Sequence, residues 1–443
     1  MASVRTSPAP LSAEVVLGKT PTIKEPRLLG GVLYWLEQRP QEQGRTTLMA
    51  RRGADQAPQE LTPGLWNLRC RVHEYGGGAC AIGQLASGEP VAVFVHDGDR
   101  CLWRLSLSEG DQQPQRLTSP GSDGRFPGAL GGGLIDPAGN RWIGVLEAGG
   151  QDQLVAVSLL GGEPEPLHSP VDFCGYPALS PSGRQLAWVE WQQPCMPWDR
   201  SQLWLAEIQA DGSLSGGRAV AGSTPADAQG CSVFQPIWAG ADLIVSNDRS
   251  GFWNLERWAD ADAGTTATTP QWHPLLPMQT EFAMPQWVFG MSTHAWDGEQ
   301  LVAFCCREGS WELGSLALPE QPGASATWQA ITTPFTDLAD LCAEAGTLAC
   351  VASSATDPSG LLELDVSSGQ WRHQPAAPCP VAAEAISRGE PLWFSGYGGQ
   401  RTQAWYYPPA GGGHPEAPLL VKGHSGPTSM ARTGLSLGIQ FWT

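Results

Sequence analysis

One turn-and-strand unit recurs along most of the chain and limits the fold more than any other feature. In each copy, a Gly in a polar turn is followed within a few residues by an apolar, β-rich run, as in Gly31 before VLYWLE. The leading glycines are Gly31, Gly88, Gly139, Gly183, Gly240, Gly298 and Gly346, at intervals of 57, 51, 44, 57, 58 and 48 residues. A second alternating strand follows each run, beginning at Thr47, Cys101, Gln153, Gln202, Asn254, Glu312 and Leu361. The chain therefore carries seven similar strand pairs.

Seven strand pairs at a loose period near fifty predict a seven-bladed β-propeller. Gly supplies the positive φ that a tight hairpin needs, and alternation with period two buries one face of each strand. A strand pair cannot bury both of its faces alone, so neighbouring units must stack, and radial closure protects their edges. The chain has 20 Trp, and we expect those at blade positions to fill the space between blades: Trp35, Trp103, Trp142, Trp188, Trp204 and Trp238.

The pattern changes near the C-terminal end of the sequence. An eighth unit begins at Gly389 (EPLWFSG), but a Pro/Gly-rich stretch follows, and the apolar run Leu419–Val421 enters a Gly/Ser turn. We therefore expect residues 1–25 to be an N-terminal extension, 26–383 to form the propeller, and 384–443 to start a different domain. Closure of an eighth blade is the alternative.

Composition excludes several classes of partner. With 44 acidic and 26 basic residues, the net charge is −18, which repels the phosphate backbone of nucleic acids. The 11 cysteines are scattered and contain no C-x-x-C, so neither a zinc site nor a disulfide framework is indicated. No signal-peptide core or 18-residue apolar run is visible. We expect a soluble, cytoplasmic protein with reduced thiols and with no metal, cofactor or membrane partner; the oligomeric state stays open.

A candidate for chemistry lies where the last apolar run ends. Leu419–Val421 has the character of a buried strand, and the tight turn His424-Ser425-Gly426-Pro427 follows it. Turns of this kind in α/β-hydrolases offer a backbone N–H to the oxyanion of an acyl-transfer intermediate. Gly permits the close approach because it has no Cβ.

These residues are part of a wider resemblance. PLLVKGHSGPTSM followed by GLSLGIQFWT resembles the first strand and turn of the peptidase domain in the prolyl oligopeptidase family. It is most similar to the acylaminoacyl-peptidase and dipeptidyl-aminopeptidase-like branch, where the turn reads His-Gly-Gly-Pro. Further matches follow the family's order: WLEQRPQEQGR, LRCRVHEYGGGA, MPWDRSQLW, NDRSGFWNLERW and QAWYYPP. The resemblance implies a propeller that caps an α/β-hydrolase, whose Ser-His-Asp triad cleaves short peptides, so that residues 384–443 would begin the hydrolase.

The resemblance also has departures. Ser425 stands at the family's first Gly, so we expect the oxyanion donor to be the N–H of Gly426, at the second. A G-x-S-x-G sequence centred on Ser436 comes too soon after Pro427 to be the nucleophile elbow, and no acid or His follows it in the hydrolase order. We therefore expect the catalytic triad to be missing from this chain, as in a truncated peptidase.

A second candidate is the segment from Arg71 to Gly78, RVHEYGGG. Its glycines would let the backbone approach the propeller axis, so that Glu74 or Arg71 faces the central cavity. In related dipeptidyl peptidases, propeller glutamates hold the substrate's free amino group. Glu74 lies outside the motif that contains those glutamates, so it would share only their role of binding the amino group. The alternative is that Glu74 forms a structural ion pair with Arg71 or a neighbour. We expect His73 to be a core or interface residue.

The leading interpretation is the substrate-gating propeller of a cytoplasmic serine peptidase that acts on short peptides. A narrow propeller channel would then exclude folded proteins by size. The alternative is a propeller that binds partners without catalysis. The sequence leaves open whether cleavage would be at chain ends or internal, and which side chain would be preferred beside the cleaved bond.

Overall fold

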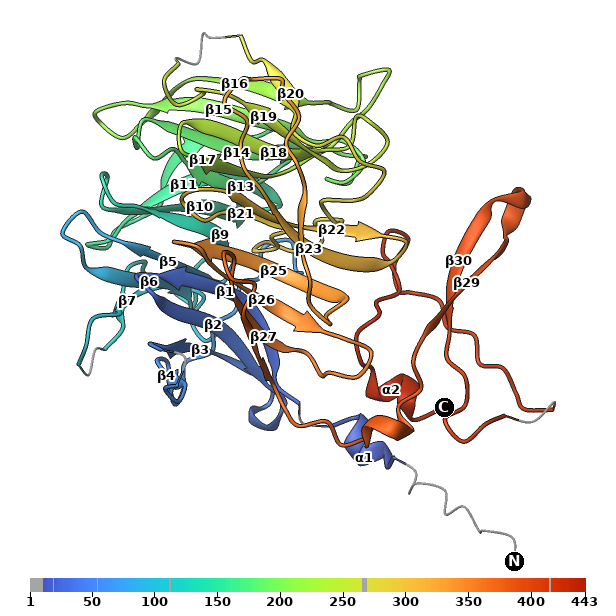
Figure 1. Cartoon of the computed structure of the whole chain (residues 1–443). Coiled ribbons are helices and arrows are strands. Elements are labelled where there is room, and N and C mark those ends of the chain that lie inside the picture. Colours follow the sequence, from blue (N-terminus) through green and yellow to red (C-terminus); the bar gives the residue numbers. More distant parts are fainter. Residues whose placement is uncertain (1–10, 19, 54, 111–112, 265–268, 414–415) are drawn as a thin grey trace, which may run out of the picture.

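Seven four-stranded antiparallel sheets surround a common axis in the computed structural model of the chain (Figure 1). The structure describes residues 11–18, 20–53, 55–110, 113–264, 269–413 and 416–443. Each sheet is a meander of four consecutive strands, so every blade is built from one contiguous segment. The fold is therefore the predicted seven-bladed β-propeller, and the eight-bladed alternative is wrong.

The strands follow one another blade by blade. Blades 1 to 3 contain β1 (Thr22–Leu29), β2 (Val32–Arg39), β3 (Arg45–Arg51), β4 (Gln59–Glu60), β5 (Cys80–Gln84), β6 (Pro90–Val95), β7 (Leu102–Ser106), β8 (Gln115–Arg116), β9 (Ala129–Asp136), β10 (Arg141–Ala148), β11 (Gln151–Ser158) and β12 (Glu165–His168). Blades 4 and 5 contain β13 (Phe173–Leu179), β14 (Gln185–Trp191), β15 (Gln202–Ile208), β16 (Leu214–Gly222), β17 (Val233–Ala239), β18 (Asp242–Asn247), β19 (Asn254–Trp258) and β20 (Trp272–Pro274). Blades 6 and 7 contain β21 (His294–Trp296), β22 (Leu301–Arg307), β23 (Ser310–Leu316), β24 (Gln329–Ile331), β25 (Asp337–Glu344), β26 (Thr347–Ser353), β27 (Gly360–Asp365) and β28 (Trp371–Pro375). The first blade thus begins a few residues before the expected boundary at 26.

Short helices complete the described secondary structure. They are α1 (Ala13–Val16), α2 (Leu437–Gln440) and the 3-10 turns η1 (Pro40–Glu42), η2 (Ala383–Ala385) and η3 (Tyr397–Gly399). In the part of the chain that the structure describes, no helix has the length and apolar character needed to cross a membrane.

The predicted strand pairs are the second and third strands of each blade. Six of the seven leading glycines lie in the turn before the second strand with φ between +60° and +110°. Gly139 is the exception, because Asn140 takes the left-handed conformation there, with φ +47°. Gly139 is instead constrained by space, since a Cβ on it would lie 2.6 Å from Asp136 Oδ2. The positive φ expected at Gly139 is therefore wrong, although the hairpin is real.

Most of the innermost strands contain a β-bulge, which is why the sequence pattern did not predict them. Five of the seven inner strands contain a register shift at or beside a residue with positive φ. These residues are Glu25, Gly132, Tyr176, Gln235 and Asp340. A β-bulge inserts an extra residue and breaks the two-residue alternation, so the strand leaves no regular pattern in the sequence. The bulges form a ring around the propeller axis.

Aromatic side chains fill the space between blades, as predicted for the Trp residues. Trp35 is 2% exposed and packs with Ala349 and Leu361, which joins blade 1 to blade 7. Trp142 lies in a cluster with Val93, between blades 2 and 3. These contacts bury large apolar surfaces that a single blade would leave in water.

The ring closes where blade 7 meets blade 1. The Glu344 carboxylate accepts hydrogen bonds from the backbone N–H groups of Gly30 and Gly31, both at 3.0 Å. One bulge bonds to another at this seam, because the Glu25 N–H donates to Asp340 Oδ2 at 3.0 Å. Strand β1 packs directly on β25 and β26. Side-chain packing and these hydrogen bonds therefore join the two ends of the ring.

The chain leaves the propeller after β28. Strands β29 (Glu390–Ser395) and β30 (Arg401–Tyr406) form a separate hairpin that projects from the ring (Figure 1). The buried strand predicted at Leu419–Val421 is wrong for this structure, since these residues form no strand and Leu420 is 60% exposed. A parallel, buried strand needs neighbours on both sides, and the described residues 376–443 provide only the two-stranded hairpin.

Candidate functional site

The candidate oxyanion turn lies against one face of the propeller. Ser425 to Thr428 form a bend in which Gly426 has φ +73°, whereas Ser425 is not left-handed. Of the two positions, only that of Gly426 has a backbone conformation that favours Gly, and this chain has a Gly there. Ser425 therefore carries no left-handed backbone strain in this conformation.

Trp287 connects this turn to the propeller. Its indole Nε1 donates a hydrogen bond to the carbonyl oxygen of Thr428 at 2.9 Å. The same ring lies 3.6 Å from the position that a Cβ on Gly426 would occupy. The turn thus rests on an aromatic ring from the loop between blades 5 and 6.

The chain that follows the turn stays attached to blade 7. Arg432 forms an ion pair with Asp337, and the Thr433 hydroxyl donates to the carbonyl oxygen of Thr336 at 2.9 Å. The Leu435 N–H donates to the carbonyl oxygen of Ser354 at 2.8 Å. These contacts fix the segment after the turn along the rim of the ring.

Three aromatic side chains form a wall beside the turn. The aromatic wall consists of Tyr75, Trp198 and Trp287, with ring centroids 4.3 Å apart for the two Trp and 5.7 Å apart for Tyr75 and Trp287. Tyr75 is 65% exposed, so the wall presents apolar surface to solvent next to Gly426. Aromatic faces of this kind bind flat or apolar groups and cations.

The loop before blade 2 brings Glu74 to this region but separates it from Arg71. Arg71 Nε pairs with Asp97 Oδ1 at 2.8 Å instead. Glu74 is exposed, has φ +64°, and its carboxylate contacts no partner among the described residues. Glu74 directly precedes Tyr75, so it lies beside the aromatic wall. The predicted alternative of a Glu74–Arg71 ion pair does not occur in this structure.

His73 is held in the interior of the same loop. Its Nε2 lies 2.8 Å from Asp152 Oδ2, and its backbone N–H donates to Glu147 Oε2 at 2.6 Å. Its ring makes T-shaped contacts with the rings of Phe173 and Phe289. The structure thus places His73 at the interface between blades, as expected.

The glycines of this loop approach the propeller axis very closely. Gly77 pairs with Phe289 backbone to backbone, and a Cβ on Gly77 would lie 2.1 Å from the Phe289 carbonyl oxygen. Residues 76–78 and 287–290, which lead into blades 2 and 6, therefore meet at the axis and form a septum. Beyond it lies a cavity of about 490 Å³, and neither Arg71 nor Glu74 lines this cavity. The expectation that either residue faces the central cavity is wrong.

Ser436 has a structural role that excludes an elbow geometry. Its side chain accepts a hydrogen bond from the Ile439 N–H and caps helix α2, and its backbone is extended, with φ −116°. A nucleophile elbow needs a strained turn directly after a strand, and residues 416–443 contain no strand. Gly434 allows close approach to blade 7, since a Cβ there would lie 2.5 Å from Asp337 Oδ2.

The described residues offer no metal site. No three His, Cys, Asp or Glu side chains among them lie in a ligating arrangement. All eleven cysteines, which fall within the described ranges, are free thiols.

Comparison with known proteins gives structural relatives only. No protein-family model matches the chain, and no curated protein matches it. A puromycin-hydrolyzing peptidase of Mycobacterium tuberculosis superposes with a TM-score of 0.84 at 29% identity, over 98% of this chain and 66% of that one. A puromycin hydrolase, solved alone and as a mutant complexed with PGG, superposes with a TM-score of 0.80 at 28% identity, over 96% of this chain and 64% of that one.

The chain has the structure of the propeller domain of prolyl oligopeptidase-family enzymes. The predicted resemblance is thereby confirmed. A prolyl endopeptidase shares the fold at 12% identity, with a TM-score of 0.53 over 87% of this chain and 52% of that one. The chain spans slightly less than two thirds of the length of its puromycin-hydrolyzing relatives.

Sequence reasoning missed the aromatic wall of this propeller. Trp287 and Thr428 are 141 residues apart, and neither belongs to a local pattern that signals a contact. A faint signal exists, since Tyr75 directly follows Glu74 in the segment already singled out. The roles predicted for Gly426, Glu74 and Arg71 stay predictions.

Proposed function

We propose that this chain is the substrate-gating propeller of a serine peptidase that hydrolyses short peptides by acyl transfer. In this proposal residues 384–443 begin an α/β-hydrolase domain, and residues 1–25 and 26–383 are the extension and the propeller. The observation that carries it is the seating of the Gly426 turn on Trp287, beside Tyr75 and the unpaired Glu74. The puromycin-hydrolyzing names of the relatives support the same reaction class.

The proposed site has two functional groups, the Gly426 N–H and the Glu74 carboxylate, with different roles. The Gly426 N–H stabilises the oxyanion of the tetrahedral intermediate, which is effective because the donor is fixed before the reaction begins. Glu74 binds the ammonium group of a short peptide, and its free carboxylate has the right charge for that contact. None of residues 1–443 serves as the nucleophile, general base or orienting acid in this proposal.

The aromatic wall gives the site a preference for apolar substrates. A peptide side chain beside the scissile bond would lie close to Gly426 and could pack against Trp287 and Tyr75. Burying an aromatic side chain there contributes favourable free energy in proportion to its apolar area.

We place the protein in the cytoplasm. Eleven free thiols, five of them buried, suit a reducing compartment better than an oxidising one.

The test uses the polypeptide encoded by the complete coding region, assayed with aminoacyl-naphthylamides and a fluorophosphonate probe. We expect hydrolysis and labelling, with Glu74→Gln raising KM about tenfold for substrates with a free amine while kcat stays within about twofold. Glu163→Gln, at an exposed carboxylate outside the site, is the matched control.

Substrates with a blocked amine separate the two roles, since Glu74→Gln should leave their KM unchanged. Gly426→Ala should lower kcat about a hundredfold, because its φ of +73° disfavours a Cβ. A complete polypeptide that neither hydrolyses nor labels would favour the alternative, a propeller that binds partners without catalysis.

A further inference from the structure

The central cavity of the propeller is closed at one end. The septum hydrogen-bonds across the axis, since the Phe289 N–H donates to the Gly76 carbonyl oxygen at 3.1 Å. It is joined to the inner strands as well: the Gly132 N–H donates to the Gly78 carbonyl oxygen at 2.9 Å, and the Tyr176 hydroxyl to the Val288 carbonyl oxygen at 2.7 Å. The channel is therefore a chamber with the septum as its floor.

The chamber lies on the side of the septum away from the Gly426 turn. Its lining residues come from the inner strands of all seven blades, from the septum and from the short loop that follows it. In the five strands that have a bulge, the lining residues begin at the bulge or after it and end before the leading turn. In β1, for example, the bulge is at Glu25, the lining residues are Arg27 and Leu28, and the turn follows at Gly30. The chamber of about 490 Å³ is thus separate from the proposed peptidase site, and it has the size of a small-molecule pocket.

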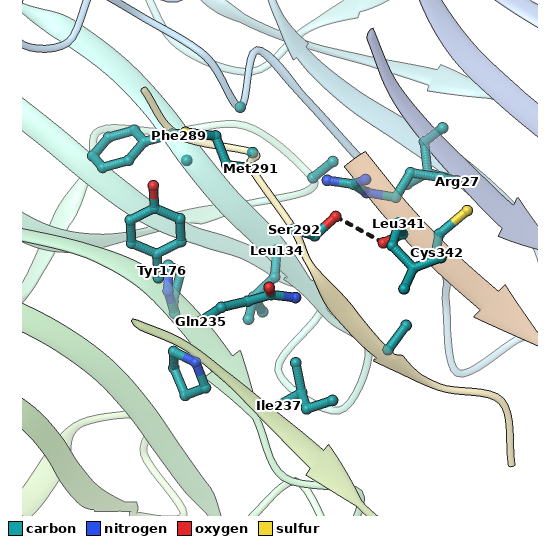
Figure 2. A pocket seen from close by; sticks show the side chains of 18 of the residues that line it. Arg27, Leu134, Tyr176, Gln235, Ile237, Phe289, Met291, Ser292, Leu341 and Cys342 are labelled. Carbon is teal, nitrogen blue, oxygen red and sulfur yellow. Dashed lines mark hydrogen bonds between the residues drawn. The ribbon is translucent and has the colours of Figure 1, made fainter. Parts of the chain in front are cut away.

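Arg27 is the one permanently charged side chain among the described residues that line the chamber. Figure 2 shows it extending from β1 toward the middle of the space. Its Nη1 donates to the carbonyl oxygen of Pro26 at 2.8 Å, and no carboxylate in the described chain forms an ion pair with it. The remaining guanidinium N–H groups are free to bind what enters the chamber.

The two nearest acidic groups, Glu25 and Asp340, each accept a backbone hydrogen bond through one oxygen, and Glu25 Oε2 has no hydrogen-bond partner among the described residues. Glu25 Oε1 accepts the Gly78 N–H at 2.9 Å, and Asp340 Oδ2 accepts the Glu25 N–H at 3.0 Å. Both carboxylates lie at the level of the septum, and neither is a lining residue. They influence Arg27 through space, but neither accepts a hydrogen bond from its guanidinium.

The other polar groups of the chamber bond within the protein. The Ser292 hydroxyl donates to the Leu341 carbonyl oxygen at 2.7 Å (Figure 2). Gln235 uses both ends of its amide, donating to the His294 carbonyl oxygen at 2.7 Å and accepting from the Thr293 N–H at 2.7 Å. Burial holds the pKa of His294 at about 4, so its ring is neutral at pH 7. A ligand would therefore be held chiefly by Arg27.

We propose that this chamber binds a small organic carboxylate. The guanidinium fork matches a carboxylate, with which it forms two parallel charge-assisted hydrogen bonds. Most of the other lining side chains are apolar or aromatic, including Ile237, Trp238, Phe289 and Trp296. Such a wall favours a carboxylate with an apolar body over a small hydrated anion such as phosphate. The binding site does not depend on peptide hydrolysis.

The test is calorimetric titration of the 443-residue chain with phenylacetate. Benzylamine has an aromatic ring but the opposite charge, and inorganic phosphate is an anion without an apolar body, so these two ligands test the two parts of the proposal. We expect phenylacetate to bind and the other two to bind at least tenfold more weakly. Arg27→Gln should weaken phenylacetate binding at least tenfold, which is about 1.4 kcal/mol, and Arg27→Lys should do so by a smaller factor. Arg125→Gln, at an exposed arginine in the loop between blades 2 and 3, is the matched control and should bind as the wild type does.

A second variant guards against a folding defect in Arg27→Gln. Ile237→Trp adds volume to the chamber wall and leaves Arg27 in place, so it should also abolish phenylacetate binding. Circular dichroism melting reports whether each variant is folded. The proposal is overturned if phenylacetate does not bind the wild type, if folded Arg27→Gln or Ile237→Trp binds it normally, or if benzylamine or phosphate binds as tightly.

Discussion

The propeller and residues 376–443 contain similar apolar sequences, but these are buried in the propeller and exposed in the C-terminal segment. In the ring, strand β22 lies between two strands of its own blade, and Phe304 at its centre is fully buried. In the C-terminal segment, Leu419–Val421 is exposed, and Leu392 and Phe394 of the β29–β30 hairpin are about half exposed. An apolar run is therefore buried only where neighbouring strands exist to cover it.

The C-terminal segment is nonetheless attached at defined points. Trp287 bonds the turn, Asp337 pairs with Arg432, and Gln440 exchanges two hydrogen bonds of 2.8 Å with the backbone of Ser387. Polar anchors thus position a segment that lacks its own core. The predictions below test how far the two regions differ.

The largest difference should appear in paired core substitutions. Phe304→Ala removes a fully buried ring and should lower the free energy of unfolding by about 3–5 kcal/mol. Leu420→Ala, at a side chain 60% exposed, should change it by less than about 0.5 kcal/mol. Chemical denaturation of both variants is the measurement, and a large loss in Leu420→Ala would show that the C-terminal segment has a core after all.

Limited trypsin digestion should distinguish the same regions by rate. Lys422 is exposed and outside any strand, whereas Arg141 lies in β10 and pairs with Asp136 at 2.8 Å. We expect cleavage after Lys422 to be at least about a hundredfold faster, since a site in the ring must open against several kcal/mol. Mass spectrometry of the early fragments gives the two rates. Equal resistance at both sites would contradict the contrast.

The pH dependence of stability should originate in the ring. Burial, the largest cause, raises the pKa of Glu25 from its usual 4.5 to about 7; Arg27 opposes this shift and Asp340 reinforces it. Between these values the folded state binds more protons than the unfolded state, so stability falls as pH rises from about 4.5 to 7. Burial also raises the pKa of Asp340, which adds to the same trend.

Glu25→Gln should therefore flatten this profile. The wild type should lose on the order of 2 kcal/mol of unfolding free energy between pH 5 and pH 8, and the variant should lose clearly less. Glu390→Gln, on the exposed hairpin, serves as the control and should keep the wild-type profile. Parallel profiles for Glu25→Gln and wild type would show that other groups carry the dependence.

The same contrast explains which features the sequence predicted. The second and third strands of each blade were predictable because a Gly turn and strict alternation are local signals. The inner strands were not, because bulges at Tyr176 and Gln235 interrupt the alternation. Glu25 was assigned to an N-terminal extension for a related reason: its role depends on Gly78 and Asp340, which are distant in sequence.

The site shows the same division between local and long-range information. The Gly426 turn was predictable, because its residues are consecutive and resemble a known motif. Trp287, which holds that turn, and Asp97, which takes Arg71 away from Glu74, are tertiary partners that no local spacing reveals. The Leu419–Val421 strand failed as a prediction because its burial depends on neighbouring strands.

The smallest effect is expected at Ser436, where a catalytic motif and a helix cap predict different outcomes. Ser436→Ala removes the cap of the four-residue helix α2, which costs about 1 kcal/mol locally. That helix lies outside the ring, so the unfolding free energy of the propeller should change by less than about 0.5 kcal/mol. Neither the wild-type chain nor the variant should react with a fluorophosphonate probe, because Ser436 has no base beside it and its hydroxyl accepts the Ile439 N–H. Labelling of the wild type that Ser436→Ala removes would make this serine a nucleophile, and the C-terminal segment would then be a reactive site as well as an anchored one.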